Sequence, residues 1–307
     1  MRRWLSLLLL AYLATPAWGA PEGAQALARA WQAERQYDYV GIQATRAAAR
    51  EVEVVVEVAH VKGGITCRHF LAPPKLAGHG AIITPRGRLR LGAAGVAHWR
   101  TGLRAESADD LPLLLRNYQV VATGMETVAG REVQGYLIRP KRPGNPSKRI
   151  WLDRESGLML KSALRNWEGK PVVESEFRQI KIGRNLPEAA SQCRLPPEPA
   201  PAPHPRPRLD FTPVQPSYLP AGYQYQGQEV IMARGRPTAH LRYSDGLNTI
   251  SLFEQQGAGP ARDLPARRNM GFSSFLYRRL GQMDAAVIGD LPPEELQRLM
   301  DSLPAAS

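Results

Sequence analysis

The chain has 307 residues, about twice the length of a usual single domain, so two domains are expected, each able to bury a core. Charged residues make up 22% of the sequence, which excludes an integral membrane protein and a highly charged disordered chain. The 40 Lys and Arg residues exceed the 28 Asp and Glu residues by 12, which points to nucleic acid, a membrane surface or an acidic protein as partner.

The N-terminus has the three-part pattern of a secretory signal peptide. Two arginines precede an apolar stretch over residues 4–14, and small residues follow it up to Ala20. The apolar stretch is too short for a good membrane-spanning helix, although an uncleaved N-terminal anchor is the alternative. We expect residues 1–19 to be a signal peptide, cleaved near Gly19-Ala20. The exported chain then keeps 38 basic and 28 acidic residues, a formal charge of +10.

Export argues against a nucleic-acid partner, and the sequence has neither zinc-finger spacing nor an RNP-type stretch. The two cysteines, Cys67 and Cys193, would meet an oxidising compartment, where a disulfide between them could persist and would close a long loop. Spacing alone does not distinguish this disulfide from two buried free thiols, so both interpretations stay open.

Helical periodicity predicts one helix at the start of the exported chain, over residues 22–36, with Leu27, Ala30 and Trp31 on one face. Alternating stretches bounded by Gly-containing turns then predict strands over residues 37–45, 51–61, 64–70, 80–83, 87–91, 96–100, 118–128, 132–139, 149–153, 158–166 and 171–182. A second helix is predicted over residues 107–118. Consecutive hairpins of this kind predict a meander, and therefore a large curved antiparallel sheet with few helices.

Two helices are too few to cover a wide apolar sheet face, so this domain could leave a cavity for an acyl chain or an apolar peptide. Ordinary core packing is the alternative. From their places on the predicted hairpins, the candidate lining residues are Trp151, Leu158, Leu160 and Phe177.

A proline-rich stretch divides the chain, because nine of the 21 positions from Pro196 to Pro216 are proline. Such a stretch favours extended polyproline II geometry and acts as a semi-rigid spacer. We therefore expect a domain over residues 20–195, a spacer over 196–216 and a smaller domain over 217–307. The smaller domain is predicted to be α+β, with a closing helix from about Pro292 and strands over residues 224–234, 238–244, 249–255, 270–280 and 284–288.

The sequence has no motif that points to catalysis. It lacks the Gly-x-Ser-x-Gly and His-Glu-x-x-His motifs, a phosphate-binding Gly-rich loop and a Cys-x-x-Cys pair, and its six histidines are scattered. We expect no enzyme, no catalytic residue, no metal and no cofactor.

The excess of arginine is the other chemical feature of the sequence that could bind a partner, since guanidinium groups fit carboxylates and phosphates well. Candidates for docking an acidic segment or an anionic lipid are Arg267, Arg268, Arg278 and Arg279, and a solvated surface is the alternative for any one cluster.

Several stretches resemble the MucB/RseB family. They include Ile-Trp-Leu-Asp-Arg-Glu-Ser-Gly-Leu over residues 150–158, Leu-Pro-Ala-Gly-Tyr over 219–223 and Tyr-Ser-Asp-Gly-Leu over 243–247. The resemblance covers nearly all of the exported chain in the same order. It implies that the large domain is similar in fold to the lipoprotein carriers LolA and LolB. The proline density of the spacer and of residues 141–148 departs from the family pattern.

The resemblance also implies a function. It implies a periplasmic negative regulator of sigma-E-type envelope-stress signalling that binds the periplasmic segment of an anti-sigma factor and shields it from regulated proteolysis. Lipid, lipopolysaccharide or a misplaced apolar peptide would release that segment. A homo-oligomer stays open, and a periplasmic lipid or lipoprotein carrier is the alternative function.

Overall fold

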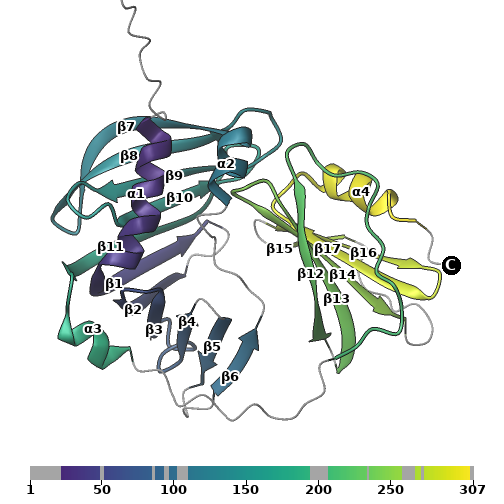
Figure 1. Cartoon of the computed structure of the whole chain (residues 1–307), viewed down its shortest axis with the longest axis horizontal. Coiled ribbons are helices and arrows are strands. Elements are labelled where there is room, and N and C mark those ends of the chain that lie inside the picture. Colours follow the sequence, from purple (N-terminus) through teal and green to yellow (C-terminus); the bar gives the residue numbers. More distant parts are fainter. Residues whose placement is uncertain are drawn as a thin grey trace, which may run out of the picture.

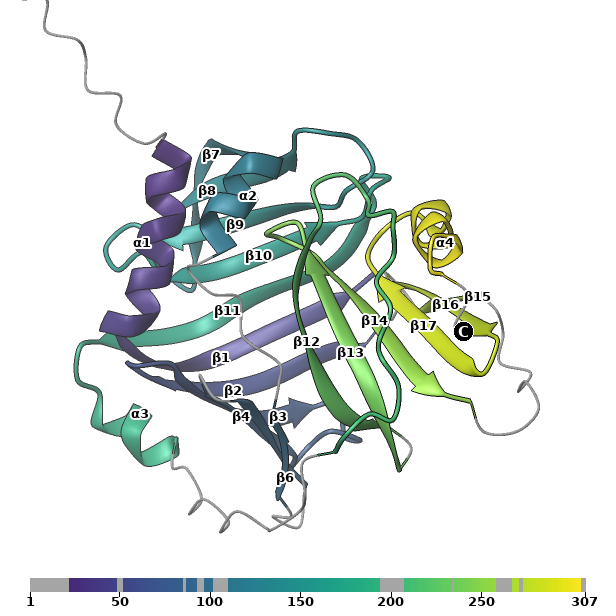
Figure 2. The same ribbon diagram turned by 45° about the vertical axis from the view of Figure 1, so that its right-hand side comes forward.

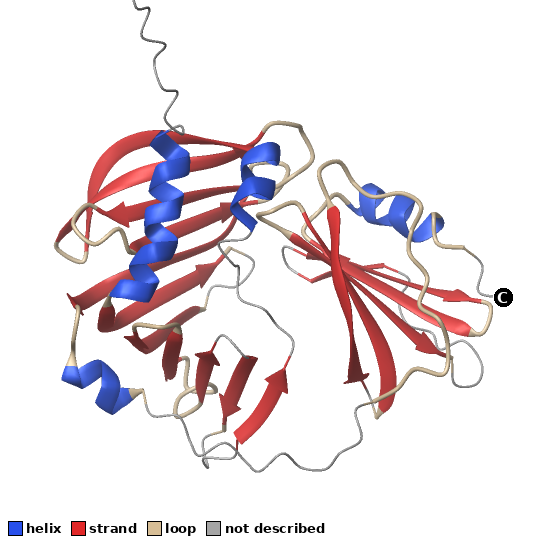
Figure 3. Cartoon of the chain, in the orientation of Figure 1, coloured by secondary structure: helices blue, strands red, loops and turns tan. Residues whose placement is uncertain are grey.

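The chain folds into two antiparallel sheets with few helices (Figure 3). A computed structural model of the whole chain describes residues 22–48, 52–84, 87–92, 97–101, 110–193, 207–233, 235–257, 267–270 and 273–304. The predicted signal peptide, residues 1–19, lies outside the described residues, as does the 196–206 part of the proline-rich stretch. Within the described ranges, no helix is long and apolar enough to cross a membrane.

The large sheet has eleven strands. They are β1 (Asp38–Ala47), β2 (Glu53–Val61), β3 (Ile65–Ala72), β4 (Gly80–Thr84), β5 (Gly87–Leu91), β6 (Ala97–Thr101), β7 (Tyr118–Val128), β8 (Arg131–Pro140), β9 (Ser147–Asp153), β10 (Met159–Arg165) and β11 (Pro171–Gly183). Helix α1 (Glu22–Gln36) confirms the first predicted helix and crosses one face of the sheet, where Leu27 is buried (Figure 1). Helix α2 (Leu111–Asn117) occupies part of the second predicted helix.

The order of the strands differs from the single meander that the turns predict. Strands β1 to β6 follow one another on one side, β7 to β11 on the other, and β1 pairs with β11 between them. The connection that contains α2 therefore runs from one edge strand to the other. Turn residues specify which consecutive strands form hairpins, but they carry no information about the partner of the first strand. Gly41 permits this pairing, because a Cβ there would lie 2.3 Å from the carbonyl oxygen of Gln179.

A short helix that the sequence did not predict, α3 (Pro187–Gln192), follows β11. Ala189 is its one buried side chain, so it carries no apolar periodicity. The Asp38 carboxylate fixes its start by accepting a hydrogen bond from the backbone N–H of Leu186 at 2.9 Å.

Directly after α3, Cys193 forms a disulfide with Cys67 of β3, and their Cα atoms lie 5.3 Å apart. The sequence left open whether the two cysteines form a disulfide or stay as free thiols, and the structure contains the disulfide.

The C-terminal domain is α+β, as predicted. Its elements are β12 (Gln224–Ala233), β13 (Arg236–Ser244), β14 (Thr249–Gln256), β15 (Arg267–Met270), β16 (Ser273–Leu280), β17 (Met283–Gly289) and α4 (Pro293–Asp301). The single strand predicted over residues 270–280 is wrong at its start, because β15 and β16 are separate strands that pair with each other, with Met270 opposite Ser273. An alternating pattern is the same for one straight strand as for two arms of a tight hairpin.

The second part of the predicted spacer lies against the core of this domain. Leu209, Phe211 and Val214 pack on a buried cluster that includes Leu252 and, from α4, Leu296. Residues 207–216 are thus part of the packing of the C-terminal domain, whatever their proline content.

A buried carboxyl group fixes this segment. Glu254 of β14 is 2% exposed, and its Oε2 accepts a hydrogen bond from the backbone N–H of Val214 at 3.0 Å. Its Oε1 has no hydrogen-bond partner in the described part of the chain. Burial raises the pKa of Glu254 to about 7, because one backbone N–H does not replace the water that the charged form loses.

We expect the contribution of Glu254 to the stability of the C-terminal domain to fall as the pH rises from about 4.5 to about 7. In this window the folded chain keeps a proton on Glu254 that the unfolded chain releases, so a rise in pH favours unfolding, by up to about 3 kcal/mol above pH 7. Glu254→Gln cannot ionise and should lose this dependence, whereas Glu168→Gln, at an exposed position, should keep it. Urea denaturation across this pH range measures both, and parallel curves for wild type and Glu254→Gln would contradict the expectation.

Candidate functional site

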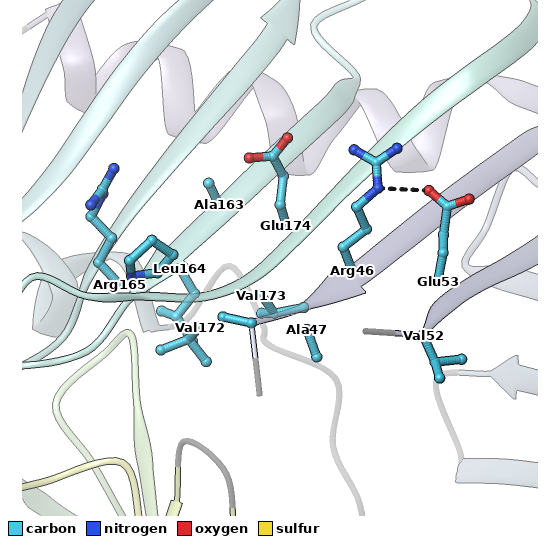
Figure 4. A pocket seen from close by; sticks show the side chains of 12 residues that line it. Arg46, Ala47, Val52, Glu53, Ala163, Leu164, Arg165, Val172, Val173 and Glu174 are labelled. Atoms are coloured by element: carbon cyan, nitrogen blue, oxygen red, sulfur yellow. Dashed lines mark hydrogen bonds and ion pairs between the residues drawn. The ribbon is translucent and has the colours of Figure 1, made fainter. Parts of the chain in front are cut away.

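A pocket of about 470 Å³ opens where β1, β2, β10 and β11 meet at one end of the large sheet (Figure 4). Its lining combines apolar and charged side chains. The apolar residues include Ala47, Val52, Leu164, Val172 and Val173, and the charged residues are Arg46, Glu53, Arg165 and Glu174. The pairing of β1 with β11 assembles this lining, because it brings Ala47 opposite Val173.

Three of the four charged lining residues form ion pairs, and the fourth, Arg165, donates a hydrogen bond to the backbone oxygen of Gly169 at 2.8 Å. The Arg46 Nε donates a hydrogen bond to Glu53 Oε1 at 2.8 Å, marked by the dashed line in Figure 4, and Glu53 also pairs with Arg178. Glu174 of the lining pairs with Lys161, whose Nζ lies 3.1 Å from Glu174 Oε1. Val52, 48% exposed, leaves apolar surface beside these pairs. Such a lining suits an apolar side chain of a peptide whose polar groups reach the charged rim.

The sequence analysis missed this pocket. Its residues come from two hairpins that are more than a hundred residues apart, such as Arg46 and Arg165, and only the β1–β11 pairing brings those hairpins together. No local pattern signals it, since each charged residue taken alone is typical of a strand end.

The four residues predicted to line an apolar cavity do meet, in a packed cluster. Trp151, Leu158, Leu160 and Phe177 are each at most 5% exposed and share one buried cluster with Val133. The pocket in Figure 4 is lined by other residues. A role of the four in ligand binding stays a prediction.

Two cations cover the ring of Trp151. The Arg149 guanidinium lies 4.5 Å and the Lys161 ammonium 5.0 Å from the ring centroid. Each cation also pairs with a carboxylate, Arg149 with Glu126 at 3.1 Å and Lys161 with Glu176 at 3.2 Å. These pairs exclude water from the indole ring and hold it in place, which adds to its burial.

A second pocket, of about 530 Å³, lies between α1 and the turn that joins β9 to β10. Its lining is largely polar and includes Arg29 and Asp153. Asp153 is 3% exposed, and its carboxylate accepts hydrogen bonds from Arg131 Nε at 2.7 Å and from the Ser156 hydroxyl at 2.7 Å. Burial acts to raise the pKa of Asp153, but these hydrogen bonds outweigh it and lower that pKa. Asp153 therefore stays charged and serves to order the turn.

Two of the four predicted docking arginines have partners within their own domain. Arg278 pairs with Asp301 of α4, and Arg279 Nε lies 2.6 Å from Asp284 Oδ1. The side chains of Arg267 and Arg268 lie outside the described residues, although their backbone forms β15. Counting charges along the sequence could not reveal these acidic partners, because the partners lie on other elements.

One histidine sits in a chain of three polar side chains on the C-terminal sheet. His240 Nδ1 lies 3.0 Å from Glu229 Oε1, and its Nε2 lies 3.0 Å from the Ser251 hydroxyl. The order of these groups is that of a serine hydrolase, but His240 is 5% exposed and stacks on Phe253 with ring centroids 4.4 Å apart. Burial lowers the pKa of His240 despite the Glu229 contact. The three side chains link β12, β13 and β14, which is a structural role.

Models of one family match both parts of the chain. Residues 94–198 match the MucB/RseB N-terminal domain, and residues 212–304 match the MucB/RseB C-terminal domain. The second match begins within the segment that packs on the C-terminal core.

Two curated proteins are similar over about 60% of the chain. The sigma-E factor regulatory protein RseB of Haemophilus influenzae is 26% identical over 196 residues, which cover 62% of this chain and 60% of that protein. The sigma factor AlgU regulatory protein MucB of Pseudomonas aeruginosa is 27% identical over 201 residues, which cover 61% and 60%. The alignments thus span about 60% of the length of these relatives.

Two solved structures share the fold over more than nine-tenths of the chain. The crystal structure of MucB in complex with MucA(peri) has a TM-score of 0.71 and 21% identity, and the match covers 93% of this chain and 100% of that one. The crystal structure of MucB has a TM-score of 0.61 and 20% identity, with 94% and 99% covered. Both sheets of this chain therefore have counterparts in a known two-domain fold.

Proposed function

We propose, from the premise that this chain belongs to the MucB/RseB family, that it regulates a sigma factor by binding the periplasmic domain of an anti-sigma factor. The observation that carries the proposal is the match of both domains, in order, to the two domains of the family. The similar curated proteins are named as sigma-factor regulatory proteins, and a MucB chain of the same fold is bound to MucA(peri).

The proposal includes a periplasmic location. Residues 1–19 have the pattern of a signal peptide, and the disulfide between Cys67 and Cys193 suits an oxidising compartment. Without the first nineteen residues the chain has a formal charge of +10, which favours an acidic partner segment and its rapid capture at low salt.

The pocket in Figure 4 is where we place one apolar side chain of the partner. Its charged rim offers both donors and acceptors, from Arg46 and Glu174, to the polar groups on either side of that side chain. A segment held there would be withheld from a protease, which needs an extended and accessible chain. Shielding from regulated proteolysis is thus part of the proposal.

The sensing step is proposed for the apolar cluster of Trp151, Leu158, Leu160 and Phe177. An acyl chain or apolar peptide that entered this cluster would have to move α1, whose Ala33 packs against it. Displacement of α1 would change the conformation of the large domain, and we propose that this change releases the partner. Carrier function is the other outcome that such a site would permit.

The test is a titration of the chain, exported to and purified from the periplasm of a host cell, with the recombinant periplasmic domain of the anti-sigma factor of the same organism. We expect saturable one-to-one binding that weakens with salt, and protection of the bound domain from proteolysis. Reversal of Arg267, Arg268, Arg278 and Arg279 to Glu should weaken binding and flatten its salt dependence.

A fragment of equal charge from an unrelated periplasmic protein is the control for the titration. Absence of binding even at low salt would overturn the proposed function. If acyl-chain probes bound instead and were passed to membrane vesicles, the carrier function would replace it. Unchanged affinity of the reversed variant at every salt concentration would remove the four arginines from the interface.

A further inference from the structure

A turn of the C-terminal domain is buried against the large domain. Residues 245–248, between β13 and β14, reach Tyr118, the first residue of β7. Figure 2 shows this end of the C-terminal sheet beside α2. The Tyr118 hydroxyl donates a hydrogen bond to Asp245 Oδ2 at 2.5 Å and accepts one from Asn248 Nδ2 at 2.8 Å. Tyr118 and Asp245 are 1% and 0% exposed. This is a dry, specific contact between the domains.

Other polar groups complete the contact. Asn117, the last residue of α2, donates to the backbone oxygens of Gly222 at 3.0 Å and Asp245 at 2.8 Å. Asn145 of the loop between β8 and β9 donates to Asp245 Oδ2 at 3.1 Å. The other oxygen of Asp245, Oδ1, accepts the backbone N–H groups of its own turn. Asp245 therefore binds both domains at once.

Two glycines let the C-terminal domain approach α2 this closely. Gly246 has φ +95°, and a Cβ there would lie 2.3 Å from the Leu114 backbone nitrogen. Gly222 has φ +92°, and a Cβ there would lie 2.5 Å from Asn117 Oδ1. A side chain at either position would meet both backbone strain and a steric clash. The two turns are thus shaped to fit the end of α2.

The same helix contacts the interior of the large domain. Leu114 of α2 belongs to a buried cluster with Leu27 of α1 and Tyr118, and Leu247 of the C-terminal turn packs on that cluster. Domains in one chain move relative to each other unless a specific interface holds them. A single element, α2, here connects the core of the large domain to the placement of the C-terminal domain.

We propose that Tyr118 and Asp245 form a latch that holds the C-terminal domain in one placement on α2, and that the anti-sigma segment binds the chain in this latched placement. The second part rests on the proposed function. Loss of the Tyr118 hydroxyl leaves the buried Asp245 carboxylate short of a donor, and opening of the contact restores its hydration. Each domain keeps its own core when the latch opens, so Tyr118 and Asp245 are positioning residues for the partner.

The experiment measures the distance between spin labels on the full chain, at Lys75→Cys in the large domain and Met232→Cys, 56% exposed, in the C-terminal domain. We expect one narrow distribution in wild type and a broad one in Tyr118→Phe. The matched control is Tyr218→Phe, which removes a tyrosine-to-carboxylate hydrogen bond of 2.5 Å to Glu295 within the C-terminal domain. It should keep the narrow distribution.

Gly246→Ala opens the latch by a different route, since its new methyl group would collide with the backbone of α2. Distributions as narrow as wild type in both Tyr118→Phe and Gly246→Ala would overturn the latch. Near-ultraviolet circular dichroism establishes that each variant is folded, and it makes the comparison independent of the partner.

The second part of the proposal, that the anti-sigma segment binds the latched placement, is tested by measuring the affinity of each variant for the periplasmic domain of the anti-sigma factor. If the latched placement falls to about a tenth of the molecules, the apparent Kd rises about tenfold, and we expect this in Tyr118→Phe but not in Tyr218→Phe. A broad distance distribution with unchanged affinity would overturn the link to partner binding. Failure of wild type to bind would overturn the proposed function, while the distances would still decide whether the latch exists.

Discussion

Replacement of both Cys67 and Cys193 with serine is expected to lower the free energy of unfolding of the large domain by about 4 kcal/mol. The two cysteines are 126 positions apart in sequence, so their disulfide removes much conformational freedom from the unfolded chain. It also ties the end of α3 to β3, at the place where the chain leaves the large domain. The loss should appear mainly in this domain, because the C-terminal domain has its own core.

Tryptophan fluorescence during urea denaturation measures this effect selectively. The exported chain has four tryptophans, Trp31, Trp99, Trp151 and Trp167, and all lie in the large domain, so the signal reports on that domain alone. Wild type treated with a reductant is the control and should approach the doubly substituted chain. A difference below about 1 kcal/mol between wild type and that variant would show that the disulfide contributes little to this domain.

Leu160→Ala is expected to cost about 3 kcal/mol of unfolding free energy. Leu160 is 0% exposed and packs among Trp151 and Phe177, so its truncation loses buried apolar area and leaves a void. The neighbouring Met159 is 39% exposed, and Met159→Ala on the same strand is the matched control, expected to change stability by less than about 0.5 kcal/mol.

This pair of variants distinguishes a packed core from an open cavity. In a cavity that waits for a ligand, Leu160 would have few neighbours, and its truncation would cost little more than that of Met159. Equal losses from the two variants would therefore contradict the packed cluster. A large loss from Leu160→Ala means that an acyl chain can enter only if the cluster rearranges.

Local signals in the sequence predict the elements of the fold well. The turns over residues 153–157 and 166–170 each contain a glycine that does adopt positive φ, +79° at Gly157 and +77° at Gly169. The flanking strands lie where the turns predict them. The pairing of β1 with β11 could not be predicted, because it depends on contacts between residues far apart along the chain.

The same holds for the candidate site residues: local patterns predict which side chains are buried, but not which distant residues they contact. Alternation identifies Trp151 and Phe177 as residues that point inward, yet it does not distinguish a filled interior from a lined cavity. From the sequence, Arg278 and Arg279 are candidates for docking a partner. In the structure they pair with Asp301 and Asp284 of the same domain. Asp245-Gly246 is a turn signal in the sequence and part of the family resemblance, but its contact with Tyr118 depends on the arrangement of the two domains.

The central position of the β1–β11 ladder has a consequence for fragments of this chain. The stretch that matches the family's N-terminal domain begins at residue 94, after β1 to β5 and α1. A fragment cut at that boundary would leave β11, thirteen residues long, without the strand that pairs with it from Asp38 to Ala47. Its unpaired N–H and C=O groups would form a long open edge that recruits other chains. Solubility of the large domain therefore depends on residues that the family match leaves out.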